Sequence, residues 1–527
     1  MRGASRALVL VSGGIIAVLV LWPMGGLLAA LIDRPADPFT GAQVSLAHLL
    51  SDAGVGRLLI RSVALSVCVA GGSVALGGWL AWIEHRSAVP RWWSWLTLLP
   101  LAMPSYLVAA TLRSALSQGG WLGRFLGIPH LTGFAVAVLV LSIITAPLSQ
   151  LIIGAALARC SAAEEDAART LGASSGAVFR DITLPRLRPA IGFSGLIALL
   201  YAISDFGAVA VLDVPVLTWR LYLAVESSDV AKAAVLGGAT LFATLPLIAA
   251  ARWIRGRTAD AGTANRRPPR PKPMSSRARL ITGLVLVTVV GLGAVIPVAT
   301  LVQWVLDGLH RDLPFVSPWT PLLDTLLAAT CGAVVTLGLA GLPALAEARR
   351  ARTTGLLEDA VYTTSALPGV LLALGLMLAT LRVTRSLPPA TYGLVLASGS
   401  LLMVGYATRF LAEVYAPLRD GLSAVDDRQI DSARVLGAGP ARRLRTVVFP
   451  AVAPGVAVAL VIGFNAIVKE LPVTLLLGGA TGLKTLSFRV WDRYSESMWH
   501  DAGLAGLILV TLALGSAWAT HHWRTDA

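Results

Sequence analysis

The chain alternates long apolar runs with short polar segments. Twelve runs are long enough to cross a membrane as helices, because a hydrocarbon core about 30 Å thick requires about 20 residues at about 1.5 Å each. The runs cover residues 7–32, 57–82, 93–112, 132–158, 190–213, 233–253, 280–306, 324–347, 359–381, 393–417, 455–478 and 501–520. The pattern predicts an all-α integral membrane protein with about 12 transmembrane helices. The first run is too long for the core of a cleaved signal peptide, so we expect it to remain as an anchor.

Composition and charge placement support this prediction. Of the 527 residues, 56% are hydrophobic and 14% are charged, against about 25% charged in soluble domains. The net charge of +14 could indicate nucleic acid or anionic lipid as a partner. With the N-terminus in the cytoplasm, however, the cytoplasmic segments hold 29 of the 43 Lys and Arg residues. This bias sets membrane orientation, so we predict contact with lipid, no nucleic acid, and N- and C-termini both in the cytoplasm.

A basic segment divides the chain into two halves. Residues 252–279 are rich in Arg, Pro, Ser and Gly, a composition with little to bury, which is typical of a solvated linker. We therefore assign residues 1–253 to the first half, with a core of about 57–253, and residues 254–279 to the linker. The second half is assigned to residues 280–527, with a core of about 324–520.

The halves repeat each other with an offset of 264 or 265 residues. The stretch "MPSYLVAATL" at 103–112 corresponds to "LPGVLLALGL" at 367–376, and "SDFGAVAVL" at 204–212 corresponds to "VKELPVTLL" at 468–476. A period this long indicates a duplicated domain. Six spans in each half give the repeats the same orientation, related by an axis along the membrane normal, so we expect a pathway between them. Pro100, Pro104 and Pro368 are candidate kinks for gates in the spans.

Two polar stretches, loop 1 (residues 164–185) and loop 2 (residues 431–450), also correspond. Each predicts a short helix ended by a glycine, Gly172 or Gly437, because glycine accepts the left-handed conformation after a helix C-terminus. A second short helix should begin at Ser174 in loop 1 and at Pro440 in loop 2. Pro185 and Pro450 should close it. The apolar faces of the first helices comprise Ala163, Ala167, Ala168 and Leu171 in one copy, and Ile430, Ala433 and Leu436 in the other. The repetition predicts a paired docking surface in the cytoplasm.

At these residues the chain resembles a known family. The stretch "EEDAARTLG" followed by "ITLP" resembles the signature loop of permease subunits of type I ABC importers. The resemblance implies the type I permease fold, the bacterial inner membrane, and a transport subunit without enzymatic activity. It further implies an extracytoplasmic solute-binding protein and two copies of an ATP-binding subunit, on which ATP and Mg would be bound.

The resemblance also assigns the coupling residues. One coupling loop would comprise Glu165, Asp166, Ala168, Gly172 and Pro185, and the other Asp431, Ala433, Gly437 and Pro450. Loop 2 departs from the family pattern, since Ile430 stands where loop 1 has Glu165 and Phe449 replaces Leu184. This departure predicts weaker or asymmetric docking there.

Ionisable residues near the ends of two spans have two interpretations. Asp205 and Glu470 occupy equivalent positions of the halves, with Lys469 beside the latter. They either cap the outer ends of the fifth and eleventh helices or contribute to the translocation path. The surrounding segments, and "TLSFRVWDRYSE" at 485–496, resemble fused permeases of ferric iron importers. Carboxylates are hard oxygen ligands that suit Fe(III), so a role in the translocation path is consistent with this resemblance, although capping is the preferred interpretation.

Alternatives remain open for the substrate and for the class of membrane protein. Fused permeases for thiamine share this architecture, and polyamine or phosphonate importers share parts of it. An ion-coupled secondary carrier with twelve helices would not need paired docking loops, and a structural membrane protein would not explain them. "GGATGLKT" at 478–485 lacks the Gly-Lys pair of a phosphate-binding loop, and neither the seven histidines nor the three cysteines have metal-ligand spacing, so no metal site is assigned.

Overall fold

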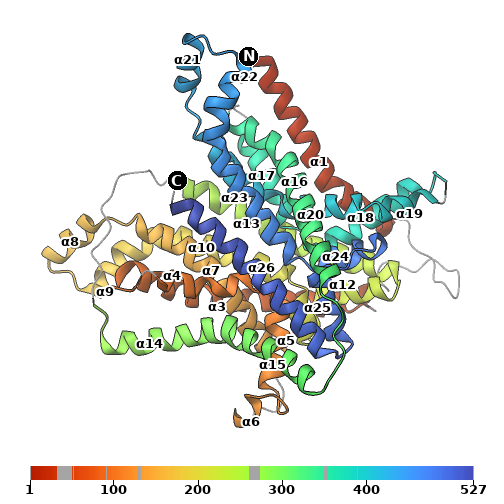
Figure 1. The fold of residues 1–527 in the computed structure, drawn as a ribbon. Helices are drawn as coiled ribbons and strands as arrows, with labels where there is room; N and C mark the ends of the chain where they lie inside the picture. The colour runs from red at the N-terminus through yellow and green to blue at the C-terminus, as the bar shows by residue number, and fades with distance from the viewer. Residues whose placement is uncertain are drawn as a thin grey trace. The chain divides into compact units, whose positions relative to one another are not determined.

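The computed structural model describes residues 2–32, 50–51, 53–90, 92–126, 132–259, 273–348, 354–388 and 390–525. Every regular element in these ranges is a helix (Figure 1). Half of the segment assigned as the linker, residues 260–272, lies outside the described residues, between the end of α13 at Ala259 and the start of α14 at Ser276. The structure therefore confirms the all-α fold class.

The first half of the chain supplies the elements from α1 to α13. They are α1 (Arg2–Ile32), α3 (Val55–Arg86), α4 (Trp92–Ala102), α5 (Ser105–Leu116), α6 (Gly123–Leu126), α7 (Phe134–Ala158), α8 (Ala162–Thr170), α9 (Ser175–Val178), the π-helix η1 (Phe179–Thr183), α10 (Leu184–Ser204), α11 (Gly207–Val211), α12 (Leu217–Glu226) and α13 (Val230–Ala259).

The second half supplies the remaining elements. They are α14 (Ser276–Leu286), the π-helix η2 (Val287–Val295), α15 (Ile296–His310), α16 (Trp319–Ala348), α17 (Thr354–Ser365), α18 (Gly369–Thr384), α19 (Ala390–Ala397), α20 (Ser400–Ser423), α21 (Asp427–Val435), α22 (Pro440–Arg443), the π-helix η3 (Leu444–Val448), α23 (Phe449–Val468), α24 (Pro472–Leu477), the 3-10 helix η4 (Gly479–Thr481), α25 (Leu486–Ser495) and α26 (Trp499–Thr525).

Nine helices in the described ranges are long and apolar enough to cross a membrane, or eleven if two bent pairs are each one span. The pairs are α4 with α5, bent by 92°, and α17 with α18, bent by 99°. Pro104 and Pro368 lie directly before α5 and α18 at these bends. Each breaks the helix there, because proline disfavours a helical conformation in the residue before it. Pro100 lies inside α4 instead. The tenth predicted span along the chain, 393–417, falls mainly on α20, which is not among the eleven.

The described helices pack into two compact units that do not coincide with the sequence halves. The first unit contains Met1–Leu49, Leu221–Gly238 and Val305–Ala527, and the second contains Leu50–Arg220 and Ala239–Trp304. Helix α1 therefore packs with helices of the second half, against α16, α17 and α18. Helices α14 and η2 pack with helices of the first half, against α3 and α4. The sequence repeat therefore does not predict which helices pack against the first helix of each half.

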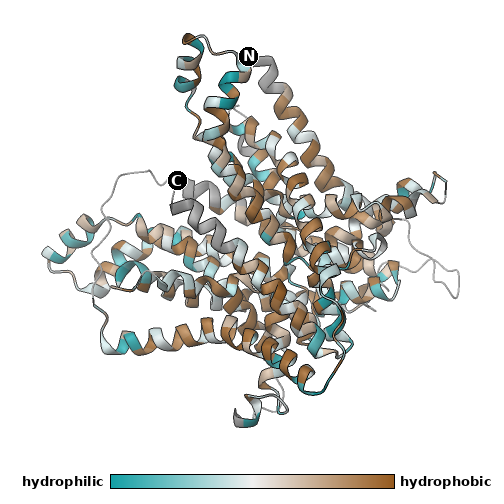
Figure 2. Cartoon of the chain, in the orientation of Figure 1, coloured by the Kyte–Doolittle hydropathy of each residue, from teal (hydrophilic) through white to brown (hydrophobic). Residues whose placement is uncertain are grey.

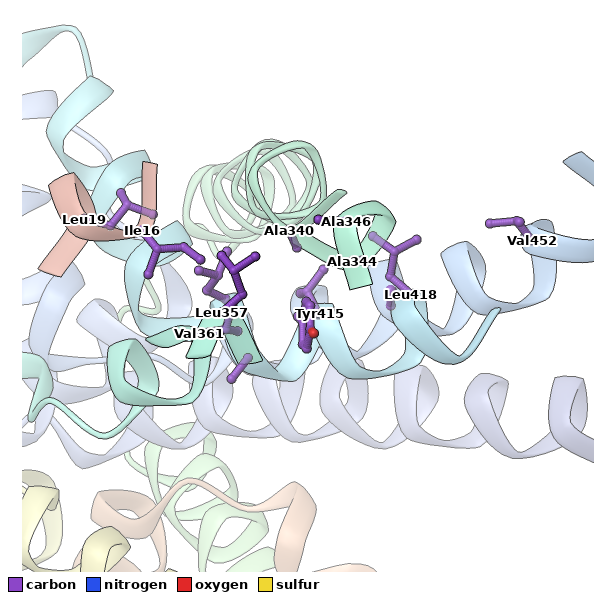
Figure 3. Close-up of a cluster of buried hydrophobic side chains, with 14 residues drawn as sticks. Ile16, Leu19, Ala340, Ala344, Ala346, Leu357, Val361, Tyr415, Leu418 and Val452 are labelled. Atoms are coloured by element: carbon purple, nitrogen blue, oxygen red, sulfur yellow. The ribbon is translucent and has the colours of Figure 1, made fainter. Parts of the chain in front are cut away.

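The core of the first unit collects apolar side chains from α1, α16, α17, α20 and α23 (Figure 3). Ile16 and Leu19 of α1 contribute to the same cluster as Leu357 and Val361 of α17 and Tyr415 of α20. These contacts hold α1 along the second half's helices.

Glycines let the helices approach closely in both units. In the second unit, a Cβ at Gly77 of α3 would lie 2.2 Å from the Ala146 carbonyl oxygen of α7, and Ser73 and Ser149 share a buried hydrogen bond of 2.8 Å between these helices. In the first unit, a Cβ at Gly375 of α18 would lie 2.4 Å from the Pro23 carbonyl oxygen of α1. Small residues at such crossings are typical of helix packing in membranes, where dispersion contacts replace the hydrophobic effect.

The α1–α18 crossing gives a stability prediction. We expect Gly375→Ala to destabilise the first unit by about 1–3 kcal/mol, because the added methyl group meets backbone atoms that cannot rotate away. Gly338→Ala in α16 is the matched control, since no atom lies within 4 Å of the added Cβ. Thermal unfolding of the detergent-solubilised protein measures both. An equal effect of the two substitutions would contradict the close approach of α1 and α18.

Candidate functional site

Loop 1 turns sharply after α8. Gly172 has a φ of +89°, in the left-handed region. Its N–H donates to the Arg169 carbonyl at 3.0 Å, and the Ala173 N–H donates to the Ala168 carbonyl at 3.0 Å. This pair of bonds is a Schellman motif, which satisfies carbonyls at the helix end. The structure confirms the predicted glycine corner and gives Ala168 a role as backbone acceptor.

Loop 2 repeats the corner at the same spacing. Gly437 has a φ of +78°, its N–H donates to the Arg434 carbonyl at 3.0 Å, and the Ala438 N–H donates to the Ala433 carbonyl at 2.9 Å. The next helix then starts as predicted, at Pro440 after the cap residue Gly439. In loop 1 the equivalent start is capped by Ser174, whose hydroxyl oxygen accepts from the Ala177 N–H at 3.3 Å.

The second short helix of each loop does not end at its proline, so that prediction was wrong. Helices α9, η1 and α10 are continuous, and α22, η3 and α23 are continuous as well. Pro185 and Pro450 lie just after the π-helical segments, where the N–H groups of Leu184 and Phe449 reach carbonyls five residues back. A π turn widens the helix, which accommodates a ring that would clash with the carbonyl four residues back in an α-helix. The prolines thus mark the start of a long helix.

Each corner presents an apolar side chain to solvent. Leu171 and Leu436, the residues directly before the two glycines, are 88% and 85% exposed. In Figure 1, α8 and α9 lie beyond the ends of α7 and α10, whereas α21 and α22 lie at the end of α23. Figure 2 shows hydrophilic residues on these short helices and mostly hydrophobic residues on the long ones. Both leucines belong to the apolar faces that the sequence predicts for the first helix of each loop.

The polar residues of loop 1 differ in their environment. Asp166 is exposed and pairs with Arg169 at 2.8 Å, whereas Glu165 is buried, with 3% of its surface exposed. Of the predicted apolar face, Ala163, Ala167 and Leu171 are exposed and Ala168 is half-buried. Helix α8 therefore directs its small apolar residues outward and attaches to the rest of the chain through a carboxylate. In loop 2, Asp431 is exposed and Ala433 is half-buried.

The carboxylate of Asp205 joins two breaks in the second unit. Asp205 follows the end of α10, and its Oδ1 accepts from the Ala208 N–H at 2.9 Å at the start of α11. Its Oδ2 accepts from the hydroxyl of Ser105, the first residue of α5. Its backbone carbonyl accepts from the Thr218 hydroxyl at 2.7 Å. This buried side chain therefore links the end of α10 to the bend between α4 and α5.

Glu470 occupies the corresponding place in the first unit. Its Oε1 accepts from the Val473 N–H at 3.1 Å, the same relation of residues i and i+3. The first residue of α18 is Gly369, and a Cβ there would lie 3.0 Å from Oε1 of Glu470. Arg409 of α20 stabilises the same bend by donating to the carbonyls of Ser365 and Leu367 at 2.7 and 2.6 Å. The carboxylate and the bend are therefore adjacent in both units.

This geometry bears on both interpretations of the ionisable residues. Asp205 and Glu470 cap the starts of the short helices α11 and α24, which follow the two long helices, whereas the first interpretation placed the caps at the ends of the long helices themselves. Lys469 is half-buried beside Glu470. No group of three or more His, Cys, Asp or Glu residues in the described part of the chain could hold a metal ion. Sequence reasoning missed Ser105, Gly369 and Arg409, although the 264-residue offset relates the first two.

Comparison with known proteins identifies the two repeats. The family model described as "Binding-protein-dependent transport system inner membrane component" matches residues 73–259 and 335–519. The first match contains loop 1 and Asp205, and the second contains loop 2 and Glu470.

Individual relatives extend the match over most of the chain. The Fe(3+)-transport system permease protein FbpB 2 of Haemophilus influenzae is 27% identical over 472 residues, which cover 88% of this chain and 89% of that protein. A probable ABC transporter permease protein, y4fN of Sinorhizobium fredii, is 26% identical and covers 69% and 67% of the two chains. The molybdenum transport system permease protein ModB of Azotobacter vinelandii is 32% identical over 25% of this chain and 58% of its own length.

The two matched segments together span more than half of the sequence, and each contains one glycine corner, one bent helix pair and one capping carboxylate. The chain is a multi-pass membrane protein that belongs to the family of binding-protein-dependent transport system inner membrane components, as a fused permease with two copies of the family's domain.

Proposed function

We propose that this permease imports ferric iron across the bacterial inner membrane, with energy from ATP hydrolysed on a partner subunit. The observation that supports ferric iron as the substrate is the match to an Fe(3+)-transport permease over nearly the full length of both chains. Relatives named for molybdenum, sulfate and 2-aminoethylphosphonate transport match 32% of this chain or less. An ion-coupled secondary carrier has no support from these relatives. Thiamine and polyamine remain the alternative substrates to be tested.

The corners of loops 1 and 2 are the proposed docking sites of two copies of an ATP-binding subunit, which would hold ATP and Mg. Leu171 and Leu436 would enter apolar pockets of the partner, and Asp166 and Asp431, both exposed, would lie at the rim. The coupling sets proposed for the loops are Glu165, Asp166, Ala168, Gly172 and Pro185, and Asp431, Ala433, Gly437 and Pro450. Gly172 and Gly437 shape these sites because glycine accepts the left-handed conformation that the corners require, directly after the exposed leucines.

The pathway is proposed to pass Asp205, Lys469 and Glu470. Carboxylate oxygens suit a hard cation such as Fe(III). Both carboxylates lie at bends of helix pairs, where a rigid-body movement of one helix would change their surroundings. Substrate would arrive on an extracytoplasmic binding protein. The N- and C-termini are proposed to be cytoplasmic, on the side of the basic segments.

Transport in proteoliposomes tests the substrate. The permease, the ATPase encoded beside it and the neighbouring binding protein are reconstituted, and uptake of radioactive iron, thiamine, putrescine and molybdate is compared. We expect ATP-dependent uptake of Fe(III) and none of the others. A binding protein that is purified with thiamine bound and that ignores Fe(III) would overturn the iron assignment and leave the importer class intact.

Disulfide crosslinking tests the docking sites. In a cysteine-free background, cysteines at Ala168 and Ala433 should crosslink to a cysteine in the partner ATPase, whereas a cysteine at the exposed Asp213 should not. The free cysteines Cys68, Cys160 and Cys331 are replaced first. Crosslinking at Asp213 alone would mean that the chain has the opposite orientation in the membrane. Crosslinking at none of the three positions would reject docking by the loops.

A further inference from the structure

Glu165 attaches α8 to the end of another helix. Arg86, the last residue of α3, donates to both carboxylate oxygens of Glu165, at 2.7 and 3.0 Å. Arg169 and Thr183 complete the carboxylate's partners at 3.2 and 3.1 Å. A bidentate pair of this kind is stronger than a neutral hydrogen bond and fixes orientation. We name Arg86, Glu165 and Thr183 the Glu165 joint; Glu165 and Thr183 are buried and Arg86 is half-buried.

Aromatic side chains hold the arginine of this joint in place. The guanidinium of Arg86 lies 5.2 Å from the centre of the Trp82 ring, within the range of a cation–π interaction. Trp82 in turn packs edge to face on Phe179 of η1, with ring centres 5.2 Å apart. The end of α3, helix α8 and η1 are therefore connected through both charge and packing. These three elements contact one another around one buried carboxylate.

Loop 2 has apolar residues at the positions of Glu165 and Thr183. At an offset of 265 residues, Ile430 stands for Glu165 and Val448 for Thr183, and Leu444 stands for Phe179. Breaking a buried ion pair leaves an uncompensated charge, a cost that an apolar contact does not have. A buried carboxylate therefore attaches loop 1 at a position where loop 2 has an isoleucine.

We propose that Arg86 and Glu165 are positioning residues for energy coupling, and that they make loop 1 a rigid extension of α3. The inference rests on the proposed docking of an ATP-binding subunit at loop 1. Since Glu165 is buried against its own chain, it acts through α8 and does not touch the partner. Movement of the docked ATPase would reach α3 directly in this half, whereas in the other half it would pass through the Gly437 corner and η3.

The test measures uptake and ATP hydrolysis in the same proteoliposomes, with the complete complex. We expect Arg86→Gln and Glu165→Gln each to lower the amount of substrate imported per ATP hydrolysed by about ten-fold, because each removes one charge of the bidentate pair that holds α8 to the end of α3. The ATPase should still copurify with both variants. Asp213→Asn is the control, since Asp213 lies outside both loops, is exposed and pairs with Arg113 at 3.2 Å, and its ratio should equal that of the unaltered chain.

Other results would overturn the proposal. If Glu165→Gln loses the ATPase on purification and Arg86→Gln does not, then Glu165 contacts the partner directly. A merely structural role would lower uptake and hydrolysis together and leave their ratio unchanged. If the glutamine variants fail to insert into the membrane, Arg86→Lys replaces them, since it keeps the positive charge and loses the second hydrogen bond. We expect this variant to lower the ratio of import to ATP hydrolysis by a smaller factor. Absence of the ATPase from the unaltered, purified complex would instead reject docking itself.

Discussion

Replacing Leu171 and Leu436 together with aspartate is expected to abolish ATP-dependent uptake while leaving the permease folded. Both leucines are almost fully exposed, so the free chain loses no packing when they change. If each is buried in a pocket of the partner, it contributes about 2 kcal/mol to the complex. Loss of both would weaken association by about a thousand-fold, and a carboxylate placed in an apolar pocket adds a desolvation cost. Copurification of the ATPase measures association, and proteoliposome uptake measures its consequence.

The control for this substitution is an exposed leucine away from the two corners. Leu313 lies in the segment after α15 and is 39% exposed, so Leu313→Asp adds the same charge without altering loop 1 or loop 2. Uptake and ATPase copurification should then resemble those of the unaltered chain. A double variant at Leu171 and Leu436 that retains the ATPase would refute docking through the corners. Each single variant should retain partial association, because the other corner remains intact.

Features encoded within a few residues could be predicted from the sequence. The corners at Gly172 and Gly437 were predicted correctly, because a glycine after a short amphipathic helix is enough to specify a left-handed residue. The bends at Pro104 and Pro368 follow from the same kind of local constraint. The repeat itself added information, since one copy supports the interpretation of the other.

Features that depend on distant partners could not be predicted. Glu165 has the same local sequence signal as its exposed neighbour Asp166, and only Arg86, 79 residues earlier, explains its burial. The π turns before Pro185 and Pro450 were missed for a related reason, because proline is normally taken as a helix end. The packing of α1 with α16, α17 and α18 also has no local signal, since an apolar helix can pack against many others.

The two capping carboxylates lead to the second large effect. In the second unit a short acid, Asp205, receives a hydrogen bond from Ser105 at the start of α5. In the first unit a longer acid, Glu470, approaches Gly369 at the start of α18, where a side chain would crowd it. Aspartate with serine and glutamate with glycine thus occupy the same position with complementary sizes.

We therefore expect Gly369→Ser to lower both thermal stability and uptake, because its Cβ would lie 3.0 Å from Oε1 of Glu470 and 3.2 Å from Cβ of Pro472. The cost should be about 1–3 kcal/mol, as for other overpacked sites. Glu470→Asp alone should also destabilise, because the shorter side chain leaves space beside Gly369. The double variant recreates the pair found in the second unit and should recover much of the loss.

A double-mutant cycle decides whether this complementarity is real, because residues in contact show coupling of about 0.5–3 kcal/mol and independent residues add. The reciprocal cycle uses Ser105→Gly and Asp205→Glu, which recreates the pair of the first unit. Ser105→Ala is its control, since it removes the hydroxyl without making room for a longer acid. Recovery of stability in both double variants would mean that the two residue pairs are interchangeable between halves. Recovery of stability without uptake would mean that Asp205 and Glu470 also act on the substrate, while additive effects in both cycles would reject the complementarity of the pairs.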